Sequence, residues 1–427
     1  MQNARIVAFV ALGVITSTST AAVDPKLLAA AEAEVPRAIG LLETMVNINS
    51  GTLNLRGVER IGMIMKKELD ALGFKTRWVP MSEIGRAGHL VAEHKGTRGK
   101  RMLLIGHLDT VFELSSPFQR FVRKGDVAEG PGTNDMKDGL AIMVAALRAM
   151  QKAGTLDDAN ITIVLSGDEE NPGRPLEVAR RDMREAATRT DVALEFESLA
   201  QKDGRDMGSI ARRSSSQWTV NVTAKSGHSS GLFSEGAGFG AAYEIARIVD
   251  TFREELREPN ATFNVGLLVG GESAKLDDLG ATGSITGKDN IIAAAAVASG
   301  DLRTLSNEQT ERIRAKMRKI VAASLPGTKA EITFEDGYPA MAPTEGSRAL
   351  LKRLNELNAE AGLPIMGELD PLDRGAGDIA FVADELDGLI GFGAAGEGGH
   401  APGENVDLTS FDRQVKRAAM FMTDLSR

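Results

Sequence analysis

The chain has 427 residues, of which 42% are hydrophobic and 26% are charged, and it contains no cysteine. This length and composition are typical of a globular protein with two domains that each bury an apolar core. The formal net charge is −9 and no long basic run is present, which argues against nucleic acid or an anionic membrane as a partner. The absence of cysteine excludes disulfide bonds and thiolate metal ligands.

The first 22 residues have the pattern of a secretory signal peptide. Arg5 precedes the apolar segment 6–15, and small residues follow at 16–22. Ten apolar residues are too few to span a bilayer, and a cleaved leader has this order of charge, apolar core and small residues. We therefore predict a signal peptide at 1–22 and a secreted or periplasmic mature protein. The alternative is that the segment forms a buried first helix.

The pattern that follows predicts an α/β domain. Helices are expected from Asp24 to about 47, with Asp24 as N-cap, and from about 57 to 72. Short apolar runs then alternate with helical patterns, which is typical of a mostly parallel, buried sheet covered by helices. The apolar runs are 102–106, 161–165, 192–196 and 389–392, and the helical patterns are 139–153, 176–187 and 408–425.

The middle of the chain predicts a second, smaller domain. Strands are expected at 217–224, 262–269, 291–302 and 330–334, and helices at 241–255 and 308–323. This arrangement is typical of an α+β fold. We therefore expect an α+β domain at 214–334, inserted into a domain formed by 23–213 and 335–427.

Each of the four apolar runs leads into residues that can bind a metal. In chain order these are His107 and Asp109, then Glu169 and Glu170, then Glu197, and then His400 in a glycine-rich segment. In open α/β sheets, ligands bind at the carboxyl ends of the strands, so we expect these side chains to converge on one crevice. Histidine and carboxylate ligands without thiolates fit zinc.

The residue types also indicate individual roles. His107 and Asp109 lie on the same side of an extended segment, so Asp109 can accept a hydrogen bond from the imidazole nitrogen that faces away from a metal. Two metal ions need a carboxylate between them, and Asp135, in a tight turn before a helix, is suited to bridge them. Of the adjacent Glu169 and Glu170, one can bind metal while the other moves a proton from water to the leaving amine.

These motifs resemble those of the co-catalytic dizinc peptidases. The matching segments are His107-Leu108-Asp109-Thr110-Val111, Gly132-x-x-Asp135-Met136-Lys137, Asp168-Glu169-Glu170 and the late His400. The family includes glutamate carboxypeptidase, acetylornithine deacetylase, succinyl-diaminopimelate desuccinylase and aminoacylase, and Leu194-Glu195-Phe196-Glu197 is most similar to glutamate carboxypeptidase. The resemblance covers essentially the whole mature chain. It implies a zinc-peptidase catalytic domain, an inserted dimerisation or lid domain, two zinc ions per subunit and a homodimer.

The resemblance also implies roles for single residues. One zinc ion would be bound by His107, Asp135 and Glu197, and the other by Asp135, Glu170 and His400. Glu169 would be the general base, and Asp109 would orient His107. The peptide bond after Asp135 would be cis.

In the inserted domain, the resemblance implies substrate-binding residues. His228 would reach a neighbouring subunit's active site and polarise the scissile carbonyl, and Asn290 would bind substrate. Arg303 would clamp a terminal carboxylate, because a guanidinium group matches a carboxylate with paired hydrogen bonds. In the segment Arg374-Gly375-Ala376-Gly377-Asp378, Gly375 and Gly377 would lie near the carboxylate end of the substrate.

The sequence therefore predicts an exported zinc carboxypeptidase that hydrolyses the amide bond before a C-terminal amino acid, with glutamate expected in folate- or peptide-type substrates. One alternative is an N-acyl amino acid deacylase, of the acetylornithine deacetylase or desuccinylase type. Another is an inactive, metal-holding peptide-binding protein. At single positions, His228 could be a polar loop residue and Arg303 a surface ion-pair partner, and His89 and His94 are interpreted as structural.

Overall fold

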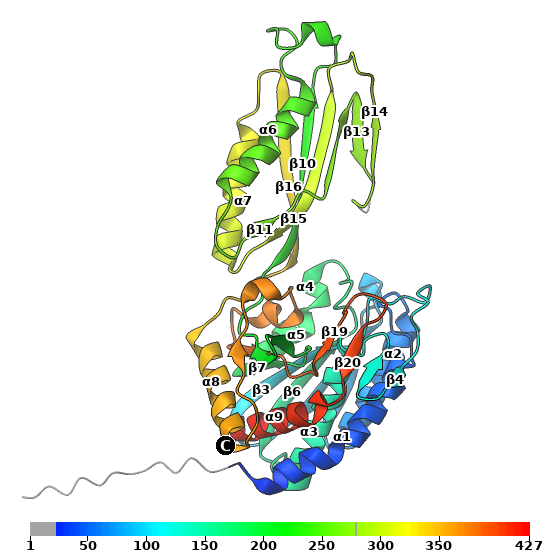
Figure 1. The fold of residues 1–427 in the computed structure, drawn as a ribbon, viewed down its shortest axis with the longest axis vertical. Helices are drawn as coiled ribbons and strands as arrows, with labels where there is room; N and C mark the ends of the chain where they lie inside the picture. The colour runs from blue at the N-terminus through cyan, green and yellow to red at the C-terminus, as the bar shows by residue number, and fades with distance from the viewer. Residues whose placement is uncertain (1–22, 278–279) are drawn as a thin grey trace, which may run out of the picture.

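The computed structural model describes residues 23–277 and 280–427, so the predicted signal peptide at 1–22 lies outside the described part. Figure 1 shows two regions, a larger body built from both ends of the chain and a smaller region built from its middle, which stands above the body in this view. Within the described residues, no helix combines the length and the apolar character needed to span a membrane.

The body is built on a six-stranded sheet in the order β1-β2-β6-β3-β7-β18. Strands β6, β3, β7 and β18 are parallel, whereas β2 pairs antiparallel with both β6 and β1. The bounds are β1 Lys75–Pro80, β2 Gly88–His94, β3 Arg98–His107, β6 Ala159–Ser166, β7 Val192–Glu195 and β18 Gly388–Ile390. The predicted α/β body with a mostly parallel central sheet is thus confirmed.

Helices cover both faces of this sheet. Met102 and Leu104 of β3 pack into the core on one face, whereas Leu103 and Ile105 pack into a second core on the other. Because successive side chains of a strand point to opposite faces, a strand covered on both sides is apolar throughout, which explains the continuous apolar runs. The helices are α1 Pro25–Val46, α2 Leu55–Asp70, α3 Lys137–Ala153, α4 Leu176–Ala179, α5 Arg181–Ala187, α8 Glu345–Glu360 and α9 Ser410–Leu425.

The inserted region consists of an antiparallel sheet with two helices on one face. The sheet has the order β11-β15-β10-β16, and β12 also pairs with β15. Trp218, Val220 and Val222 of β10 are buried in the core under the helices, while the alternating residues Gln217 and Asn221 are exposed. The bounds are β10 Ser215–Ala224, α6 Gly240–Glu255, β11 Thr262–Phe263, β12 Leu267–Gly271, β15 Ala295–Arg303, α7 Asn307–Ala322 and β16 Thr328–Tyr338.

Short elements complete the fold. They are β4 Val122–Lys124, β5 Val127–Glu129, β8 Ala200–Lys202, β9 Arg205–Gly208, β13 Ser273–Leu276, β14 Gly283–Thr286, β17 Gly367–Glu368, β19 Gly396–Glu397 and β20 Asn405–Asp407, with 3₁₀ turns η1 Ser82–Ile84, η2 Ser229–Gly231, η3 Pro371–Asp373 and η4 Asp378–Val382. The loop between β19 and β20 carries His400 and the glycine-rich segment that was expected near the carboxyl edge of the body sheet.

Three predicted elements differ from the structure. The helix expected at 176–187 is interrupted at Arg180, whose φ of −118° is not helical. The strand expected at 262–269 is divided into β11 and β12, and the strand expected at 291–302 begins only at Ala295. Strand β16 continues to Tyr338, past the predicted limit at 334, and this extension brings the end of the inserted region against the body.

Candidate active site

A cleft of about 940 Å³ lies at the carboxyl edge of the body sheet. Its lining includes Asp135, Glu169, Glu197, Arg212, Arg374 and His400. Glu169 and Glu197 follow the parallel strands β6 and β7, and the other four lie on loops between other elements. The carboxyl edge of the strands is where open α/β sheets bind ligands. The structure therefore brings together side chains that are separated by up to about 270 positions in the sequence.

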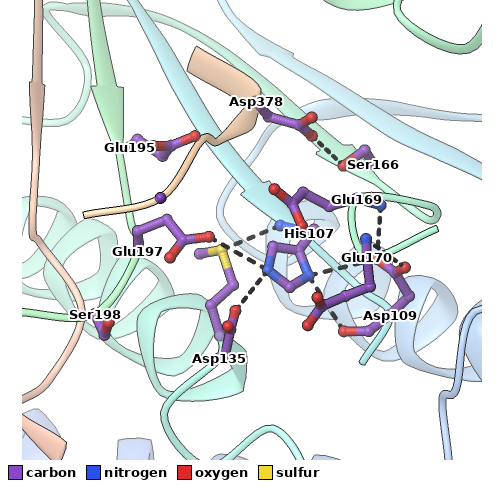
Figure 2. A network of polar contacts seen from close by, with 12 residues as sticks. His107, Asp109, Asp135, Ser166, Glu169, Glu170, Glu195, Glu197, Ser198 and Asp378 are labelled. Atoms are coloured by element: carbon purple, nitrogen blue, oxygen red, sulfur yellow. Dashed lines mark hydrogen bonds and ion pairs between the residues drawn. The ribbon is translucent and has the colours of Figure 1, made fainter. Parts of the chain in front are cut away.

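One half of the site is buried and lies around His107. Its Nε2 is 3.0 Å from Asp135 Oδ1 and 3.4 Å from Glu197 Oε1, and its side chain is only 1% exposed (Figure 2). His107 is the last residue of β3, and Glu197 follows β7, so two adjacent parallel strands fix the distance between them.

The other half of the site lies around His400, on the opposite side of Asp135. His400 Nε2 is 3.0 Å from Asp135 Oδ2 and 3.2 Å from Glu170 Oε2. His400 is 61% exposed and belongs to a loop, where it has a positive φ of 67°. Asp135 therefore offers one oxygen to each half, as expected of a bridging carboxylate.

The distances fit a pair of divalent metal ions. A tetrahedral metal with bonds of about 2.0–2.1 Å has neighbouring ligand atoms about 3.3 Å apart, and the four distances given above run from 3.0 to 3.4 Å. Three groups among the described residues could hold an ion: His107 with Asp135 and Glu197, Asp135 with Glu170 and His400, and His107 with Glu169 and Glu170. The first two are the sets that the resemblance implies.

The electrostatics of the site also favour positive charge there. Burial, followed by repulsion from Asp135, raises the pKa of Glu170 to about 7. Burial also raises the pKa of Glu169 well above its usual range, with further repulsion from neighbouring carboxylates. Crowded carboxylates that are costly to ionise become favourable when cations bind between them. The donor set therefore suits hard or borderline divalent ions.

Asp109 supports both His107 and the two adjacent glutamates. The Nδ1 of His107 is 3.2 Å from the carbonyl oxygen of Asp109 and 3.4 Å from its Oδ1. The carboxylate of Asp109 also accepts hydrogen bonds from the backbone N–H groups of Glu169, at 3.0 Å, and Glu170, at 3.1 Å (Figure 2). It accepts a further hydrogen bond from Thr52 Oγ1 at 2.6 Å. Asp109 thus lies against the imidazole nitrogen that faces away from Asp135, and its carboxylate also holds the turn that carries the glutamates.

The turn at Asp135 is fixed from the far end of the chain. The backbone N–H groups of Asn134 and Asp135 donate to Glu404 Oε1 at 2.8 and 3.1 Å, and the Asp135–Met136 peptide bond is cis, as expected. Glu404 is fully buried and lies four residues after His400. One carboxylate therefore ties the bridging residue to the loop that carries the exposed histidine.

A buried ionic network lies behind Glu169. Arg180 donates to Asp168 and Asp378, at 2.7 Å each, and to Tyr338 Oη at 3.0 Å, and Tyr338 in turn donates to the carbonyl oxygen of Glu169. Asp168, although part of the acidic motif, is therefore an ion-pair partner and not a side chain of the cleft. The break between α4 and α5 at Arg180 positions its guanidinium for this network.

Two arginines of the cleft, Arg212 and Arg374, were not identified as site residues from the sequence. Arg212 is buried, with its Nη2 at 3.3 Å from Glu195 Oε2 and 3.4 Å from Glu197 Oε2, and its Nη1 donates to the carbonyl of Ala376 at 2.6 Å. A Cβ on Gly377 would lie 2.7 Å from the Cζ of Arg212, so this position needs glycine. Gly375 lines the cleft, as expected for the loop near the substrate.

The three predicted substrate residues of the inserted region lie elsewhere. His228 is exposed and its Nδ1 is 2.9 Å from Ser230 Oγ. Arg303 donates to Asp301 at 3.0 Å, which matches the alternative of an ion-pair partner, and Asn290 is exposed in a turn. In the part of the chain that the structure describes, none of the three lines the cleft.

The remaining two histidines, which were interpreted as structural, have partners outside the cleft. His89 is buried, and its Nε2 is 3.3 Å from Asp168 Oδ1. His94 Nδ1 is 2.9 Å from the carbonyl oxygen of Ala159, on the neighbouring strand β6. Neither residue belongs to the metal-type groups found among the described residues.

A mostly parallel α/β body whose strand ends present histidines and carboxylates at metal-binding distances defines a metallohydrolase. The model of peptidase family M20/M25/M40 matches residues 103–424, so the chain belongs to this family. It is 29% identical to carboxypeptidase G2 of Pseudomonas sp. (strain RS-16) over 418 residues, which cover 94% of this chain and 92% of that protein. It is 33% identical to a succinyl-diaminopimelate desuccinylase of Novosphingobium aromaticivorans over 169 residues, or 38% of this chain and 44% of the relative.

Solved structures share the whole fold. A metallo-carboxypeptidase of the M20 family from Sulfolobus solfataricus has a TM-score of 0.64 at 15% identity, covering 91% of this chain and 99% of that one. A dinuclear metal-binding peptidase of the M20 family from Bacillus subtilis has a TM-score of 0.62 at 15% identity, covering 92% and 98%. The fold with a catalytic body and an inserted region is therefore the fold of these peptidases, and the chain is a metallohydrolase of the peptidase type.

Proposed function

We propose that the protein is a dizinc carboxypeptidase that hydrolyses the amide bond before the C-terminal amino acid of small peptides or folate-type compounds. The observation that carries the proposal is the position of Glu169. It lines the cleft, and its carboxylate lies within 4.8 Å of the ligand atoms of His107 and Glu170, yet it is not needed for either set of bridged ligands. A carboxylate held at that position without a ligand role is suited to proton transfer.

The residues of the site can be assigned to steps of this hydrolysis. When bound, two zinc ions supply Lewis acidity that makes a water nucleophilic and polarises the amide carbonyl. His107, Asp135 and Glu197 would hold one ion, and Asp135, Glu170 and His400 the other. Glu169 accepts the proton of the attacking water and then donates it to the leaving amine nitrogen. Its buried position, which raises its pKa, favours this second, acidic role.

Similarity favours a carboxypeptidase over a deacylase. The match to carboxypeptidase G2 extends over nearly the whole chain, whereas the desuccinylase match covers 38% of it. The desuccinylase match nevertheless supports an N-acyl amino acid deacylase as the second candidate. A metal-holding binding protein is the third, and the position of Glu169 argues against it because binding alone does not require a proton-transfer group.

We also propose that the mature protein is exported and homodimeric. The pattern at 1–22 supports export. The position of His228 supports a dimer, because this residue resembles one that serves a neighbouring subunit and is exposed, outside the cleft of its own chain. In a symmetric dimer, the His228 side chain of one copy would reach the cleft of the other copy.

The first test combines a substrate panel with the variant Glu169→Gln. Zinc-loaded protein is assayed with glutamate-terminated dipeptides and pteroates beside acetyl and succinyl amino acids. Release of C-terminal glutamate is expected to be fastest, and Glu169→Gln is expected to lower kcat by about 10²–10⁴-fold. Metal content should stay at the wild-type level, because Glu169 is not an assigned ligand.

The matched control is Glu235→Gln, which changes an exposed carboxylate of the inserted region. This variant should keep wild-type activity. A loss of less than tenfold in Glu169→Gln would contradict the proton-transfer role. Preference for small acyl groups would support the deacylase, and no turnover of any compound would support the binding protein.

A further inference from the structure

The guanidinium group of Arg374 reaches the cleft without being fully bonded. Arg374 precedes the loop that contains Gly375, and its side chain is 20% exposed. Its Nη2 donates to the carbonyl oxygen of Ser198 at 2.6 Å and to Ser198 Oγ at 3.0 Å, so one nitrogen is anchored to the segment that follows Glu197. The same Nη2 is 4.0 Å from Glu197 Oε2. The group is therefore held close to the metal-type ligands.

The other two nitrogens of Arg374 have no partner. Nε is buried and makes no hydrogen bond within residues 23–277 and 280–427. Nη1 makes none with these residues either, and it is not among the buried atoms, so it is the nitrogen that faces the open cleft. Guanidinium has five N–H donors, and Nη2 uses two of them. Of the remaining three, the two N–H groups of Nη1 are the ones that a ligand in the cleft can reach.

The other cations of the cleft are already neutralised. Arg212 lies between Glu195 and Glu197 and holds the carbonyl groups of the glycine-rich loop. Lys202 forms an ion pair of 2.6 Å with Asp373. Arg374 is therefore the cation of the described cleft that is best placed to meet an incoming anion.

We infer that Arg374 binds a carboxylate of the substrate. This inference rests on the proposed carboxypeptidase function and names the group that the cleft recognises. A C-terminal amino acid presents its α-carboxylate close to the scissile amide, and a glutamate residue presents a second carboxylate on its side chain. Either group would form charge-assisted hydrogen bonds with the N–H groups of Nη1. Arg303 does not compete for this role within one chain, because it pairs with Asp301 outside the cleft.

The test uses two variants and three matched substrates. Arg374→Gln removes the charge, and Arg374→Lys keeps it without the planar group. The substrates are dipeptides that end in glutamate, in glutamine, or in glutamate with an amidated α-carboxylate. We expect Arg374→Gln to lower kcat/KM by about 10- to 100-fold for the substrate that carries the recognised carboxylate. Arg374→Lys should lose less than Arg374→Gln.

The pattern of losses identifies the carboxylate. A loss confined to substrates with the glutamate side chain assigns the side-chain carboxylate, and an equal loss for glutamate and glutamine, with none for the amidated substrate, assigns the α-carboxylate. Equal loss for all three substrates would overturn the inference, because it would reflect displacement of Glu197 or the loop. Zinc content and Tm, measured for each variant, identify such displacement directly.

The control is Arg98→Gln, which removes an exposed, ion-paired arginine that does not line the cleft. It should change none of the substrate ratios. If the wild-type protein releases no C-terminal amino acid from any substrate, the proposed function fails. If it does release them and Arg374→Gln keeps the wild-type ratios, the inference alone fails.

Discussion

The body and the inserted region use their polar residues in opposite ways. In the body, His107, Asp109 and Glu197 are buried at strand ends, and each has polar partners within the same chain. In the inserted region, His228 and Asn290 are exposed on turns outside the cleft. Burial makes an unpaired polar group costly, so the partners of a buried group reveal its role. An exposed polar group does not need a partner within the chain, so its contacts do not indicate its role. That role depends on the molecule that binds it.

The largest effect is expected from removing His107, because its imidazole is an assigned ligand of the buried half of the site in the body. His107→Ala should lose more than about 100-fold in metal affinity, since loss of an outer partner of a ligand alone costs 10–100-fold. His400→Ala should retain more metal after dialysis against a chelator, because its half of the site is exposed and lies on a loop. Metal analysis after dialysis checks the order of the two variants.

Both variants should show little hydrolysis, because each lacks one complete half-site. The helical content of the inserted region should not change, which circular dichroism can follow beside metal content. If His107→Ala kept wild-type metal content and activity, the assignment of the buried half-site would be wrong.

A smaller effect is expected from His228→Ala, which tests whether the inserted region acts on a second copy. Loss of a group that stabilises the oxyanion lowers kcat by about 10²–10³-fold, and zinc content should not change. In a random mixture with Glu169→Gln, activity should return to roughly a quarter of the wild-type value. The reason is that half of the dimers are hybrids, and one of their two sites has both an intact Glu169 and an intact His228.

The mixture separates a dimer from a monomer. If His228 served its own chain, no mixing ratio would restore activity, because each chain would keep its own defect. If His228→Ala were fully active by itself, His228 would be a polar loop residue, as the alternative interpretation holds.

The smallest effect is expected from Tyr338→Phe, which tests how the two regions are coupled. Tyr338 ends β16 of the inserted region and donates to the carbonyl oxygen of Glu169 in the body. Loss of one hydrogen bond costs about 1 kcal/mol, and we expect kcat to fall by about 3- to 10-fold with unchanged zinc content. The control is Tyr243→Phe, which changes the other tyrosine of the chain, an exposed one on α6. Equal rates for the two variants would show that the contact does not position Glu169.

The sequence predicted the body well where the pattern was local. The apolar runs at 102–106 and 161–165 are adjacent parallel strands in the structure. They could be recognised because a strand that is buried on both faces is apolar at every position. The helix at 176–187 was wrong because Arg180 leaves helical geometry to reach Asp168 and Asp378. These ion pairs form only in the folded chain, so the spacing of neighbouring residues does not predict them.

For the site, the sequence identified the residue types that can bind metal, and order and spacing identified the family. Residue order and spacing also predicted the turn at Asp135 and the contact between His107 and Asp109. The roles of Thr52, Glu404, Arg212, Arg374 and Tyr338 came only from the structure. Each acts on a residue that is distant in the chain, and each belongs to a type that is common on protein surfaces.

By itself the sequence determined an α/β body with an inserted α+β region, and a set of histidines and carboxylates at the carboxyl ends of buried strands. These follow from hydrophobic periodicity and from chemistry that a few residue types can perform. Only the tertiary structure decided that Glu404 ties the turn at Asp135 to the loop of His400, and that Arg374 has free donors in the cleft. Such facts depend on distances of a few ångströms between segments hundreds of residues apart, and these distances are set by packing, which no local pattern of residues encodes.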